Sequence, residues 1–417
     1  MSQTPDSFDI LVLGGGGREH ALCWKLRQSP RVGRLICAPG NAGIAAVAEC
    51  ADLDIKDPAA VTAFTQANAI RLVVVGPEDP LVAGVVDALR AAGIAAFGPT
   101  AAAARLEGSK GFTKDLCRAA GIPIAGFRRF ASAAEAHHYV AVHPLPVVIK
   151  ADGLAAGKGV TVAESNEEGL AALADLDGAV VVEECLTGPE ASLFVLTDGK
   201  TISIWPSAQD HKRAFDEDTG PNTGGMGVVS PAPLLTDALL SRAVAEIIKP
   251  TLKAMADAGT PYTGVLYAGL MLTPQGPKLI EYNCRFGDPE CQALMLRLNT
   301  DLADILLACA EGRLHEAAAG WSAEAAVVVV YAAMGYPKSA ITGTVIDGIA
   351  DAEALGVQVF HAGTRRTDAG KLVAAGGRVL GISALGHDIG EARALAYAAI
   401  RKIRWHGGFY RRDIGRV

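Results

Sequence analysis

The chain has 417 residues, of which 50% are hydrophobic, and a formal net charge of −7 at pH 7. This length allows about two to four domains with packed cores and excludes a disordered chain. The negative charge excludes a general attraction to nucleic acid, and the longest apolar run, residues 325–334, is far shorter than the about 20 residues that cross a bilayer.

The eight cysteines are scattered and include no Cys-x-x-Cys pair. This spacing favours reduced thiols and argues against a zinc site. Cys185, Cys284 and Cys291 are interpreted as small buried hydrophobic residues. The amino terminus contains Asp6 and Asp9 in place of the basic region of a signal peptide. We therefore expect a soluble cytoplasmic protein with no membrane partner and no nucleic-acid partner.

The amino-terminal part alternates strand and helix patterns. An apolar strand over residues 8–13 leads into glycines at residues 14–17 and then a helical pattern. A dinucleotide site is not favoured, because Glu19 replaces the third glycine of its fingerprint and no acid follows the second strand. Instead we expect a sugar phosphate at the amino terminus of the first helix, where N–H groups and the helix dipole point. The strands and the helix predicted next cover residues 34–38, 71–75 and 81–92.

Residues 147–149 and 160–162 are predicted to form two strands on either side of a glycine-rich loop. Lys150 ends the first strand and Lys158 lies in the loop, so a polyphosphate is the expected ligand. The loop is not a Walker motif, because its glycine spacing differs and no Ser or Thr follows the lysine. From this stretch alone, an ordinary hairpin with a lysine-bearing turn remains the alternative.

Long motifs along the chain occur in the order found in one enzyme family. They are Gly-Gly-Arg-Glu-His at 16–20, Pro-Gly-Asn-Ala-Gly at 39–43, Gly-Pro-Glu-Asp-Pro-Leu at 76–81, Glu-Gly-Ser-Lys at 107–110, Lys-Ala-Asp-Gly-Leu-Ala-Ala-Gly-Lys-Gly at 150–159, Gln-Asp-His-Lys-Arg at 209–213, Asp-Thr-Gly-Pro-Asn-Thr-Gly-Gly-Met-Gly at 218–227 and Glu-Tyr-Asn-Cys-Arg-Phe-Gly-Asp-Pro-Glu at 281–290. With these motifs the chain resembles the phosphoribosylamine–glycine ligase family, the glycinamide ribonucleotide synthetases of the ATP-grasp superfamily. The resemblance covers residues 10–414.

The resemblance implies an α/β fold, α+β overall: an ATP-grasp fold with an amino-terminal Rossmann-like domain and a carboxy-terminal mixed domain. The sequence pattern supports the last boundary independently, because a helix over residues 302–311 is followed by new strands over 325–333 and 376–382. The implied parts are an amino-terminal α/β substrate-binding domain at 1–105, a central ATP-grasp domain at 106–122 and 187–322, its lid at 123–186 and a carboxy-terminal domain at 323–417.

The implied reaction is the ATP-dependent ligation of glycine to 5-phosphoribosylamine in purine biosynthesis. A carboxylate oxygen is a poor leaving group, so such enzymes phosphorylate glycine first, and the amine then attacks glycyl phosphate. Phosphoryl transfer of this kind depends mostly on positioning and charge neutralisation. The resemblance thus implies ATP as co-substrate and Mg²⁺ or Mn²⁺ as metal, with small-molecule substrates, and a monomer is expected.

The resemblance also implies the nucleotide contacts. Lys110 and Lys150 match the lysines that contact nucleotide phosphates, and Lys158 lies in the loop between the two strands. The other nucleotide candidates, for adenine and ribose, are Glu183, Glu184, Cys185, Leu186 and Glu190. If the motif is disregarded, Lys150 is interpreted as a lysine that packs its apolar stem on the protein and keeps its charge in solvent. Glu183 and Glu184 are then interpreted as exposed acids.

Glu281 and Asn283 are the candidate metal ligands. They lie two apart on a predicted strand and so share a face, and hard oxygen donors suit a divalent cation that bridges phosphates. Arg285 follows on that face and is expected to stabilise the transferring phosphoryl group or to hold the glycine carboxylate. A surface arginine is the alternative. Arg285, Lys150 and Asp210 form the predicted catalytic set.

The acceptor side is predicted to combine the first glycine loop with a second one at residues 223–227. The substrate candidates are Gly16, Gly17, Arg18, Glu19, Asn41, Glu78, Lys212, Arg213, Gly225 and Asp288. His20 and His211 are interpreted as hydrogen-bonding residues, because an amine that attacks an acyl phosphate needs little base assistance.

The chain departs from the family pattern in two places. Gly15 stands where Asn or Ser is expected, and the segment between residues 162 and 180 is shorter than usual, which is expected to weaken water exclusion. At the other end, Arg411, Arg412 and Arg416 are interpreted as a solvated tail or as contacts for small anions.

Two rival functions are possible. Another ATP-grasp ligase, such as a biotin carboxylase or a formate-dependent transformylase, would share the ATP half but would not predict the motifs at 209–213 and 218–227. A catalytically silent nucleotide-binding regulator is the other rival. The intact set of Lys150, Glu281, Asn283 and Arg285 argues against it.

Overall fold

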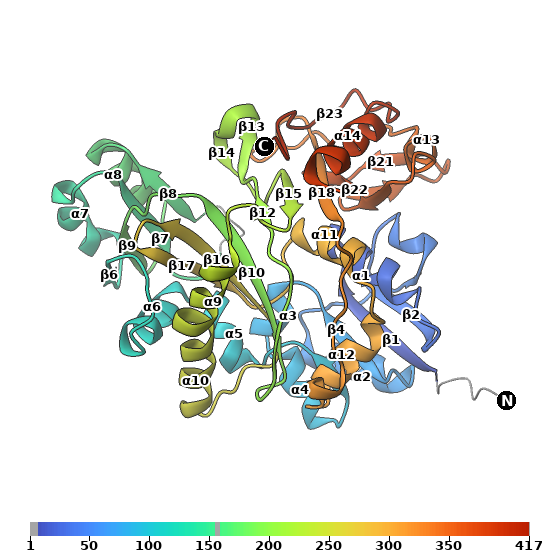
Figure 1. Ribbon diagram of the computed structural model, residues 1–417, viewed down its shortest axis with the longest axis horizontal. Coiled ribbons are helices and arrows are strands. Elements are labelled where there is room, and N and C mark those ends of the chain that lie inside the picture. Colours follow the sequence, from blue (N-terminus) through green and yellow to red (C-terminus); the bar gives the residue numbers. More distant parts are fainter. Residues whose placement is uncertain (1–6, 155–158, 417) are drawn as a thin grey trace.

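The computed structural model describes residues 7–154 and 159–416. It consists of several sheets joined through shared helices, with the amino-terminal and carboxy-terminal parts on one side and a small sheet of the middle segment at the opposite end (Figure 1). None of the described helices is long and apolar enough to span a membrane.

The amino-terminal part is a parallel five-stranded sheet in the order β3-β2-β1-β4-β5. Its strands are buried apolar runs whose faces alternate, since Ile10 and Val12 enter one core cluster and Leu11 and Leu13 enter another. The chain order reverses between β1 and β4, so the loops after these strands meet at one edge. The elements are β1 (Phe8–Gly14), α1 (Gly17–Leu26), β2 (Val32–Pro39), η1 (Ile44–Ala46), β3 (Glu49–Cys50), α2 (Pro58–Ala67), β4 (Leu72–Val75), α3 (Glu78–Val82), α4 (Val85–Ala91) and β5 (Ala95–Phe97).

The helix predicted over residues 81–92 is wrong in one respect, because it is two helices. Gly84 separates α3 from α4 with φ 86°, a left-handed conformation that ends one helix and begins the next. Helix α3 begins at Glu78, inside the Gly-Pro-Glu-Asp-Pro-Leu motif that follows β4.

A small antiparallel sheet in the order β6-β9-β7-β8, which we call the lid sheet, forms the end that lies away from both termini (Figure 1). Its inner face packs Val147, Ile149, Val180 and Val182 against two helices. The two strands predicted around the glycine-rich loop are confirmed as β7 and β8, whereas Lys158 lies outside the described residues. The elements are β6 (Phe127–Phe130), α7 (Ala133–Val142), β7 (Val147–Ala151), β8 (Val160–Ala163), α8 (Asn166–Ala174) and β9 (Val180–Glu184).

The central sheet has the order β11-β10-β16-β17 and is antiparallel. Helices α5 and α6, which precede the lid sheet in the chain, are separated by Ser109, the N-cap of α6. The elements are α5 (Ala101–Gly108), α6 (Lys110–Ala119), β10 (Glu190–Thr197), β11 (Ile202–Ile204), α9 (Asp237–Ala243), η3 (Val244–Ile248), α10 (Lys249–Asp257), β16 (Gly264–Thr273) and β17 (Gly276–Asn283).

The carboxy-terminal sheet has the order β12-β15-β18-β22-β19, with β23 paired to β18. Strands β12 and β15 come from residues far earlier in the chain, so this sheet is built from two distant segments. Helix α11 packs between it and α1. The elements are β12 (Gln209–Asp210), β13 (Arg213–Phe215), η2 (Asp216–Asp218), β14 (Thr219–Asn222), β15 (Gly227–Ser230), α11 (Glu290–Arg297), α12 (Leu302–Ala310), η4 (Leu314–Glu316), β18 (Ala325–Ala333), α13 (Ile349–Glu353), β19 (Gln358–His361), β20 (Thr364–Arg366), β21 (Leu372–Ala374), β22 (Arg378–Gly386), α14 (Ile389–Ile400) and β23 (Gly408–Phe409).

A histidine pair joins the amino-terminal and carboxy-terminal parts. The backbone N–H of His361 donates to Nδ1 of His20 over 2.7 Å, and both side chains are buried. Burial, followed by the charge of His361, lowers the pKa of His20 to about 3. Burial, followed by Arg366, lowers the pKa of His361 to about 4. The folded protein therefore holds both rings neutral.

This pair predicts a loss of stability in acid. Both folded pKa values lie below the unfolded value of about 6.5, so the unfolded state binds more protons as the pH falls through this range. We expect His20→Asn, whose Oδ1 can accept the same N–H, to reduce the pH slope of the unfolding free energy by up to about 1.4 kcal/mol per pH unit. Urea unfolding between about pH 7 and pH 5 measures this slope.

The matched control is His137→Asn on the exposed face of α7, which should leave the slope unchanged. Equal slopes for His20→Asn and the parent chain would show that the pair does not control acid stability.

Candidate active site

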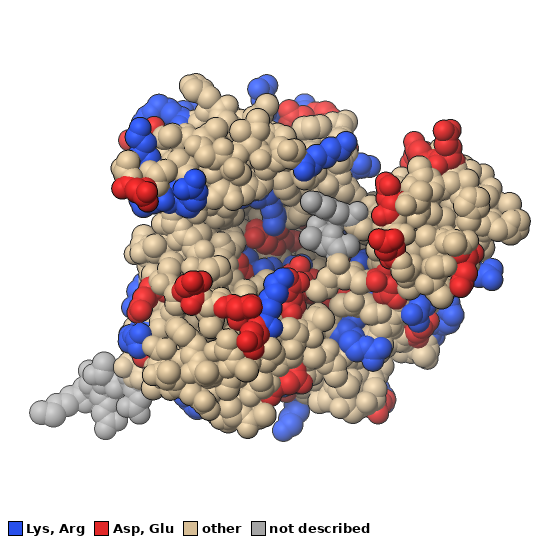
Figure 2. All heavy atoms as spheres, turned by 180° about the vertical axis from the view of Figure 1, so that it is seen from behind, with Lys and Arg blue, Asp and Glu red and all other residues tan. Residues whose placement is uncertain are grey.

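A cleft of about 930 Å³ lies where the amino-terminal loops, the lid sheet and the central sheet meet. Seen from behind, the molecule is hollowed between its lobes, with charged side chains of both signs in the hollow (Figure 2). Most of the predicted site residues line this cleft: Arg18, Glu78, Lys110, Lys150, Glu183, Glu184, Cys185, Leu186, Glu190, Asp210, Lys212, Arg213, Glu281, Asn283, Arg285 and Asp288.

Among the described residues, five predicted substrate residues lie behind the cleft wall and shape its loops: Gly16, Gly17, Glu19, Asn41 and Gly225. The Glu19 carboxylate is buried and accepts from the Gly16 N–H and from Arg18 Nε, both over 2.6 Å. The Asn41 side-chain amide donates to the carbonyls of Gly15 and His361, both over 2.9 Å. These contacts hold the loop after β1 in place.

The amino terminus of α1 is already matched by carboxylates. Besides the Glu19 contact, the Arg18 N–H donates to Oδ2 of Asp288 over 3.4 Å. The dipole of a helix attracts a carboxylate as it attracts a phosphate. The expectation of a sugar phosphate on these amides stays a prediction, and such a phosphate would compete with these two carboxylates. Arg18 itself stays at the cleft wall, where Nη1 donates to the Phe286 carbonyl over 3.2 Å.

Two lysines share one buried acid at the base of the lid sheet. Lys114 Nζ donates to Glu183 Oε2 over 2.8 Å, and Lys150 Nζ lies 3.1 Å from Glu183 Oε1. The second contact is an ion pair without hydrogen-bond alignment, since Oε1 has no hydrogen-bond partner among the described residues. Burial, only partly opposed by Glu183, lowers the pKa of Lys114. Glu183 is thus a buried bridge, and the alternative of an exposed acid is wrong for it.

Lys114 was missed by the sequence reasoning. It follows Lys110 by four positions on α6, so the two side chains share one helix face, and this spacing was the available signal. Lys110 Nζ donates to the Gly153 carbonyl over 2.8 Å, which brings the loop after β7 to the same helix. Burial lowers the pKa of Lys110, although Glu281 opposes this effect.

Glu281 and Asn283 project into the cleft from the end of β17. The pairing with β16 shifts register just before Glu281, and this bulge re-aims the end of the strand. Burial raises the pKa of Glu281, but Lys212, Lys150 and Lys110 outweigh it, so the net shift is downward and the group is ionised. Lys212 Nζ lies 3.0 Å from Glu190 and 3.7 Å from Glu281.

No cluster of three or more His, Cys, Asp or Glu side chains that could hold a metal occurs within residues 7–154 and 159–416. A metal here would take an ionised carboxylate from Glu281 and an amide oxygen from Asn283, and most of its remaining ligands from substrate. Mg²⁺ is commonly bound in this way, with one or two protein carboxylates and with nucleotide phosphates. The residues present therefore fit a phosphate-bound divalent metal.

Arg285 joins the central sheet to the amino-terminal loops. Its Nε pairs with Glu78 over 2.9 Å, and its Nη2 pairs with Glu107 over 2.9 Å. Burial opposes its charge, but the two acids outweigh this and raise its pKa. The surface-arginine alternative is wrong. Glu107 was also missed, although it belongs to a motif quoted above; its carboxylate accepts from the Cys284 N–H over 2.7 Å.

Arg378, from β22, brings the carboxy-terminal sheet to the acceptor side. Its Nη1 donates to the Gly224 carbonyl over 2.5 Å and to the Asp288 carbonyl, and its Nη2 lies 3.6 Å from Asp288 Oδ2. The sequence offered no signal for it, since residues 376–382 were only predicted to start a strand. Beneath it, burial and then Glu290 raise the pKa of Asp210 well above its usual range.

Gly225 leaves room for Asp210. It has φ 111°, and a Cβ there would lie 2.6 Å from Asp210 Oδ1. The His211 backbone N–H donates to Asp210 Oδ1 over 2.7 Å, and its side-chain Nδ1 lies 3.3 Å from the Gly227 carbonyl, a contact that fits the hydrogen-bonding interpretation. The solvated-tail interpretation is wrong for Arg411, which is fully buried and pairs with Asp218 and Asp413, both over 2.6 Å.

Family models of phosphoribosylglycinamide synthetase match three consecutive stretches. The N domain matches residues 8–107, the ATP-grasp (A) domain residues 108–291 and the C domain residues 326–417. The chain belongs to the phosphoribosylglycinamide synthetase family. It is 56% identical to the phosphoribosylamine–glycine ligase of Mesorhizobium japonicum over 98% of both chains, and 56% identical to that of Agrobacterium fabrum over 97% of both.

Solved structures agree with this assignment. The crystal structure of phosphoribosylamine–glycine ligase from Thermotoga maritima has a TM-score of 0.83 at 32% identity and covers 97% of this chain and 100% of its own. A biotin carboxylase from Campylobacter jejuni has a TM-score of 0.71 at 16% identity, covers 96% of this chain and 92% of its own, and therefore shows the shared fold alone.

As a phosphoribosylglycinamide synthetase, the chain is an enzyme, a ligase with the ATP-grasp fold that acts in purine biosynthesis. Its family uses ATP together with a divalent metal. The predicted fold class and family are confirmed. The silent-regulator rival and the other ATP-grasp ligases lose their support.

The buried acid between the lysines predicts a large effect on stability. Glu183→Gln leaves Lys114 and Lys150 without their shared counter-charge, and removing one partner of a buried ion pair costs about 3 to 5 kcal/mol. We expect a reduction of that order in the free energy of unfolding, measured by urea denaturation. Asp257→Asn, which breaks the exposed Lys253–Asp257 pair, is the control and should have little effect. Similar losses in both variants would contradict the buried-bridge role.

Proposed function

We propose that this chain joins glycine to 5-phosphoribosylamine through glycyl phosphate, giving glycinamide ribonucleotide, ADP and phosphate. A glycine carboxylate oxygen attacks the γ-phosphorus of ATP, and the bond between that phosphorus and ADP breaks. The amine nitrogen then attacks the carbonyl carbon, phosphate departs with the bridging oxygen, and the nitrogen loses a proton. The observation that carries this proposal is one cleft that holds lysines, paired oxygen donors and the amino-terminal loops together.

In this proposal Lys110 and Lys150 bind the ATP phosphates, and Lys158, which lies outside the described residues, is the third phosphate contact expected from the sequence. Lys150, which is buried on β7, and Lys110, which is half-buried on α6, would neutralise charge that spreads over the phosphoryl oxygens during transfer. The end of β9, with Glu184, Cys185 and Leu186, meets adenine, and Glu190 meets the ribose. Glu183, which pairs with Lys114 and Lys150, keeps these two buried lysines in position.

We assign the metal, Mg²⁺ or Mn²⁺, to Glu281 and Asn283. When bound, it would neutralise the phosphate oxygens that bridge it to the protein. Lys212 lies beside both Glu281 and Glu190. If a metal were bound to Glu281, Lys212 would keep Glu190 as its partner. Arg285, held between Glu78 and Glu107, is assigned to the glycine carboxylate or to the transferring phosphoryl group.

The acceptor side is assigned to residues from three distant segments of the chain. Arg18 and Glu78 come from the amino-terminal part, Asp210, Lys212 and Arg213 from the segment of β12 and β13, and Asp288 from the loop before α11. Gly16, Gly17, Glu19, Asn41 and Gly225 shape these loops without facing the cleft. Arg378 and Lys114 join the site as supports for Asp288 and Glu183.

The remaining expectations stay proposals of the same kind. The eight free cysteines are what a reducing compartment predicts, so we propose a cytoplasmic location. We also propose a monomer, and we keep the division into parts at 1–105, 106–122 with 187–322, 123–186 and 323–417. The shared carboxy-terminal sheet means that the second and last of these parts fold against each other.

Glycine labelled with heavy oxygen in both carboxylate positions tests the reaction. If glycyl phosphate forms, the released phosphate carries one labelled oxygen and glycinamide ribonucleotide retains the other. Mass spectrometry of the phosphate distinguishes this from direct phosphorylation of the amine, which transfers no label. Unlabelled phosphate during productive turnover would contradict the acyl-phosphate route.

Two substitutions separate the two ends of the cleft. We expect Arg18→Ala to raise KM for 5-phosphoribosylamine and to leave KM for ATP nearly unchanged, because it removes a charge on the acceptor side only. Lys150→Ala should raise KM for ATP and lower kcat, since it removes charge stabilisation at the phosphates. Each variant is the control for the other. An equal rise of KM for ATP in both variants would contradict the assignment of Arg18 to the acceptor side.

A further inference from the structure

Asp152 lies in the loop directly after β7, two positions beyond Lys150, and its carboxylate is turned towards helix α6. Oδ1 accepts from the Ser109 hydroxyl over 3.0 Å and from the Gly111 N–H over 3.1 Å. The side chain is only 10% exposed. Its own backbone N–H donates to the Ala179 carbonyl over 2.9 Å, which anchors the loop to the start of β9.

Through these contacts Asp152 caps helix α6, although Asp152 itself belongs to the loop after β7. Ser109 is the local N-cap of α6, and its hydroxyl accepts from the Phe112 N–H over 3.1 Å while it donates to Asp152. The first N–H groups of a helix have no partner within the helix, and its dipole favours a negative charge there. The lid-sheet loop supplies that charge from outside.

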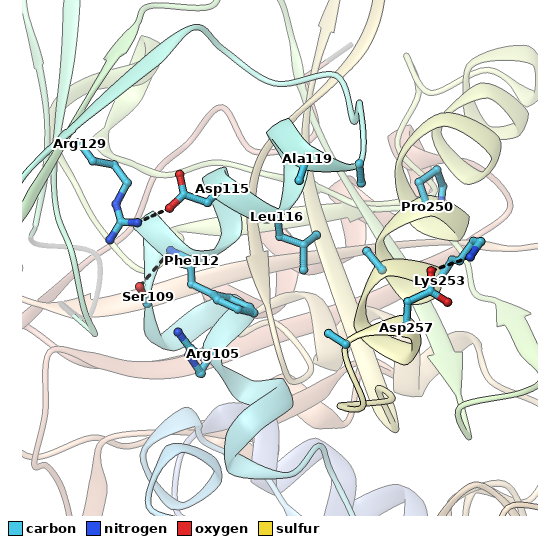
Figure 3. Close-up of a pocket in the computed structure, with 13 residues that line it drawn as sticks. Arg105, Ser109, Phe112, Asp115, Leu116, Ala119, Arg129, Pro250, Lys253 and Asp257 are labelled. Carbon is cyan, nitrogen blue, oxygen red and sulfur yellow. Dashed lines mark hydrogen bonds and ion pairs between the residues drawn. The ribbon is translucent and has the colours of Figure 1, made fainter.

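A second strand of the lid sheet reinforces the junction. Arg129, on β6, pairs with Asp115 one turn further along α6 and has Nη2 3.5 Å from Asp152 Oδ2. Its guanidinium packs so closely on Gly111 that a Cβ there would overlap it. Figure 3 shows the outer side of this junction, with the Arg129–Asp115 pair and the Ser109–Phe112 hydrogen bond beside a hollow of about 810 Å³.

Each side of the junction carries one of the two lysines assigned to the ATP phosphates. Lys110 is the first residue of α6 after its N-cap, and its Nζ donates to the Gly153 carbonyl over 2.8 Å, next to Asp152. Lys150 is near the end of β7. The distance between these lysines is therefore set by how the loop after β7 sits on the amino terminus of α6.

We propose that Asp152 is a positioning residue, which caps helix α6 from the lid sheet and thereby holds Lys110 and Lys150 at the spacing that the phosphates of ATP require. The inference rests on the proposed contacts of these lysines with ATP. It assigns Asp152 no contact with ATP and no part in bond making. Its effect passes through the two lysines, so nucleotide binding should depend on it and glycine binding should not.

The test compares Asp152→Ala, Asp152→Asn and Asp115→Asn in the full chain. Losing two hydrogen bonds to a charged acceptor should weaken ADP binding in Asp152→Ala by about tenfold or more. Isothermal calorimetry measures it without turnover. Asp152→Asn keeps an acceptor oxygen for Ser109 and Gly111, so a smaller loss is expected. Asp115→Asn breaks the same Arg129 network away from the loop and should bind ADP as the parent chain does.

Two further readouts separate positioning from a general loss of structure. KM for ATP should rise in parallel with the ADP dissociation constant, whereas KM for glycine should stay within about twofold. Hydrogen exchange at the Gly111 amide should speed up in Asp152→Ala, speed up less in Asp152→Asn, where the charge of the cap is lost, and remain slow in Asp115→Asn. Faster exchange at the Gly111 amide with unchanged ADP affinity would show that Asp152 only caps the helix, and would overturn the proposal.

Lys150→Ala distinguishes this inference from the assignment of the nucleotide site. If Lys150→Ala weakens ADP binding and Asp152→Ala does not, the positioning role fails and the nucleotide site stands. If neither variant weakens it, the lysine assignment fails and the positioning role fails with it. If Asp152→Ala does not fold, Asp152→Asn decides, and unchanged ADP affinity in that variant overturns the proposal.

Discussion

Charge compensation inside the cleft is the constraint on which the rest of the structure depends. Removing an ion from water costs several kcal/mol even after relaxation, so buried lysines and arginines must each meet an acid. Here Glu183 serves two lysines, Arg285 has two acids, and Lys212 lies between Glu190 and Glu281. Every one of these groups joins different secondary-structure elements, so the sheets must meet in one arrangement for the charges to be matched.

The same matching explains why the site can receive a highly charged ligand. A polyphosphate and its metal bring charges of both signs, and the cleft already holds both signs close together. Lys150 on the lid sheet and Lys110 on α6 line the same cleft as the Glu281 carboxylate at the end of β17, so a phosphate group and a metal ion could each meet a charge of opposite sign. The protein keeps these groups stable beforehand by pairing them with one another.

Local features of the fold could be predicted from the sequence, whereas partners across the molecule could not. Apolar runs and glycines identified β1, β7, β8 and β18, because the burial of a strand can be predicted from its own apolar residues. The break at Gly84 was missed, since a glycine inside a helical pattern does not reveal its φ. Most of the predicted site residues lay within contiguous motifs, and most of them line the cleft.

The missed residues have a different origin. Glu107 and Lys114 stood in or beside a recognised motif, but their partners Arg285 and Glu183 lie far along the chain. Arg378 lies in a segment whose pattern indicates only a strand. The contact of Asp288 with the amino terminus of α1 was not predicted for a similar reason, because Asp288 is remote in sequence. Pairings of this kind require the tertiary arrangement.

The carboxy-terminal sheet has a consequence for the order in which the protein can form. Strands β12 and β15 are made early, yet β15 pairs with β18, where Gly227 faces Val329 about a hundred positions later. During synthesis from the amino terminus, the segment with Asp210 and Lys212 is therefore made before β18, the strand with which β15 pairs. Contacts of such long sequence separation form slowly and leave strand edges exposed meanwhile. One wall of the cleft is thus among the last parts of the nascent chain to be completed.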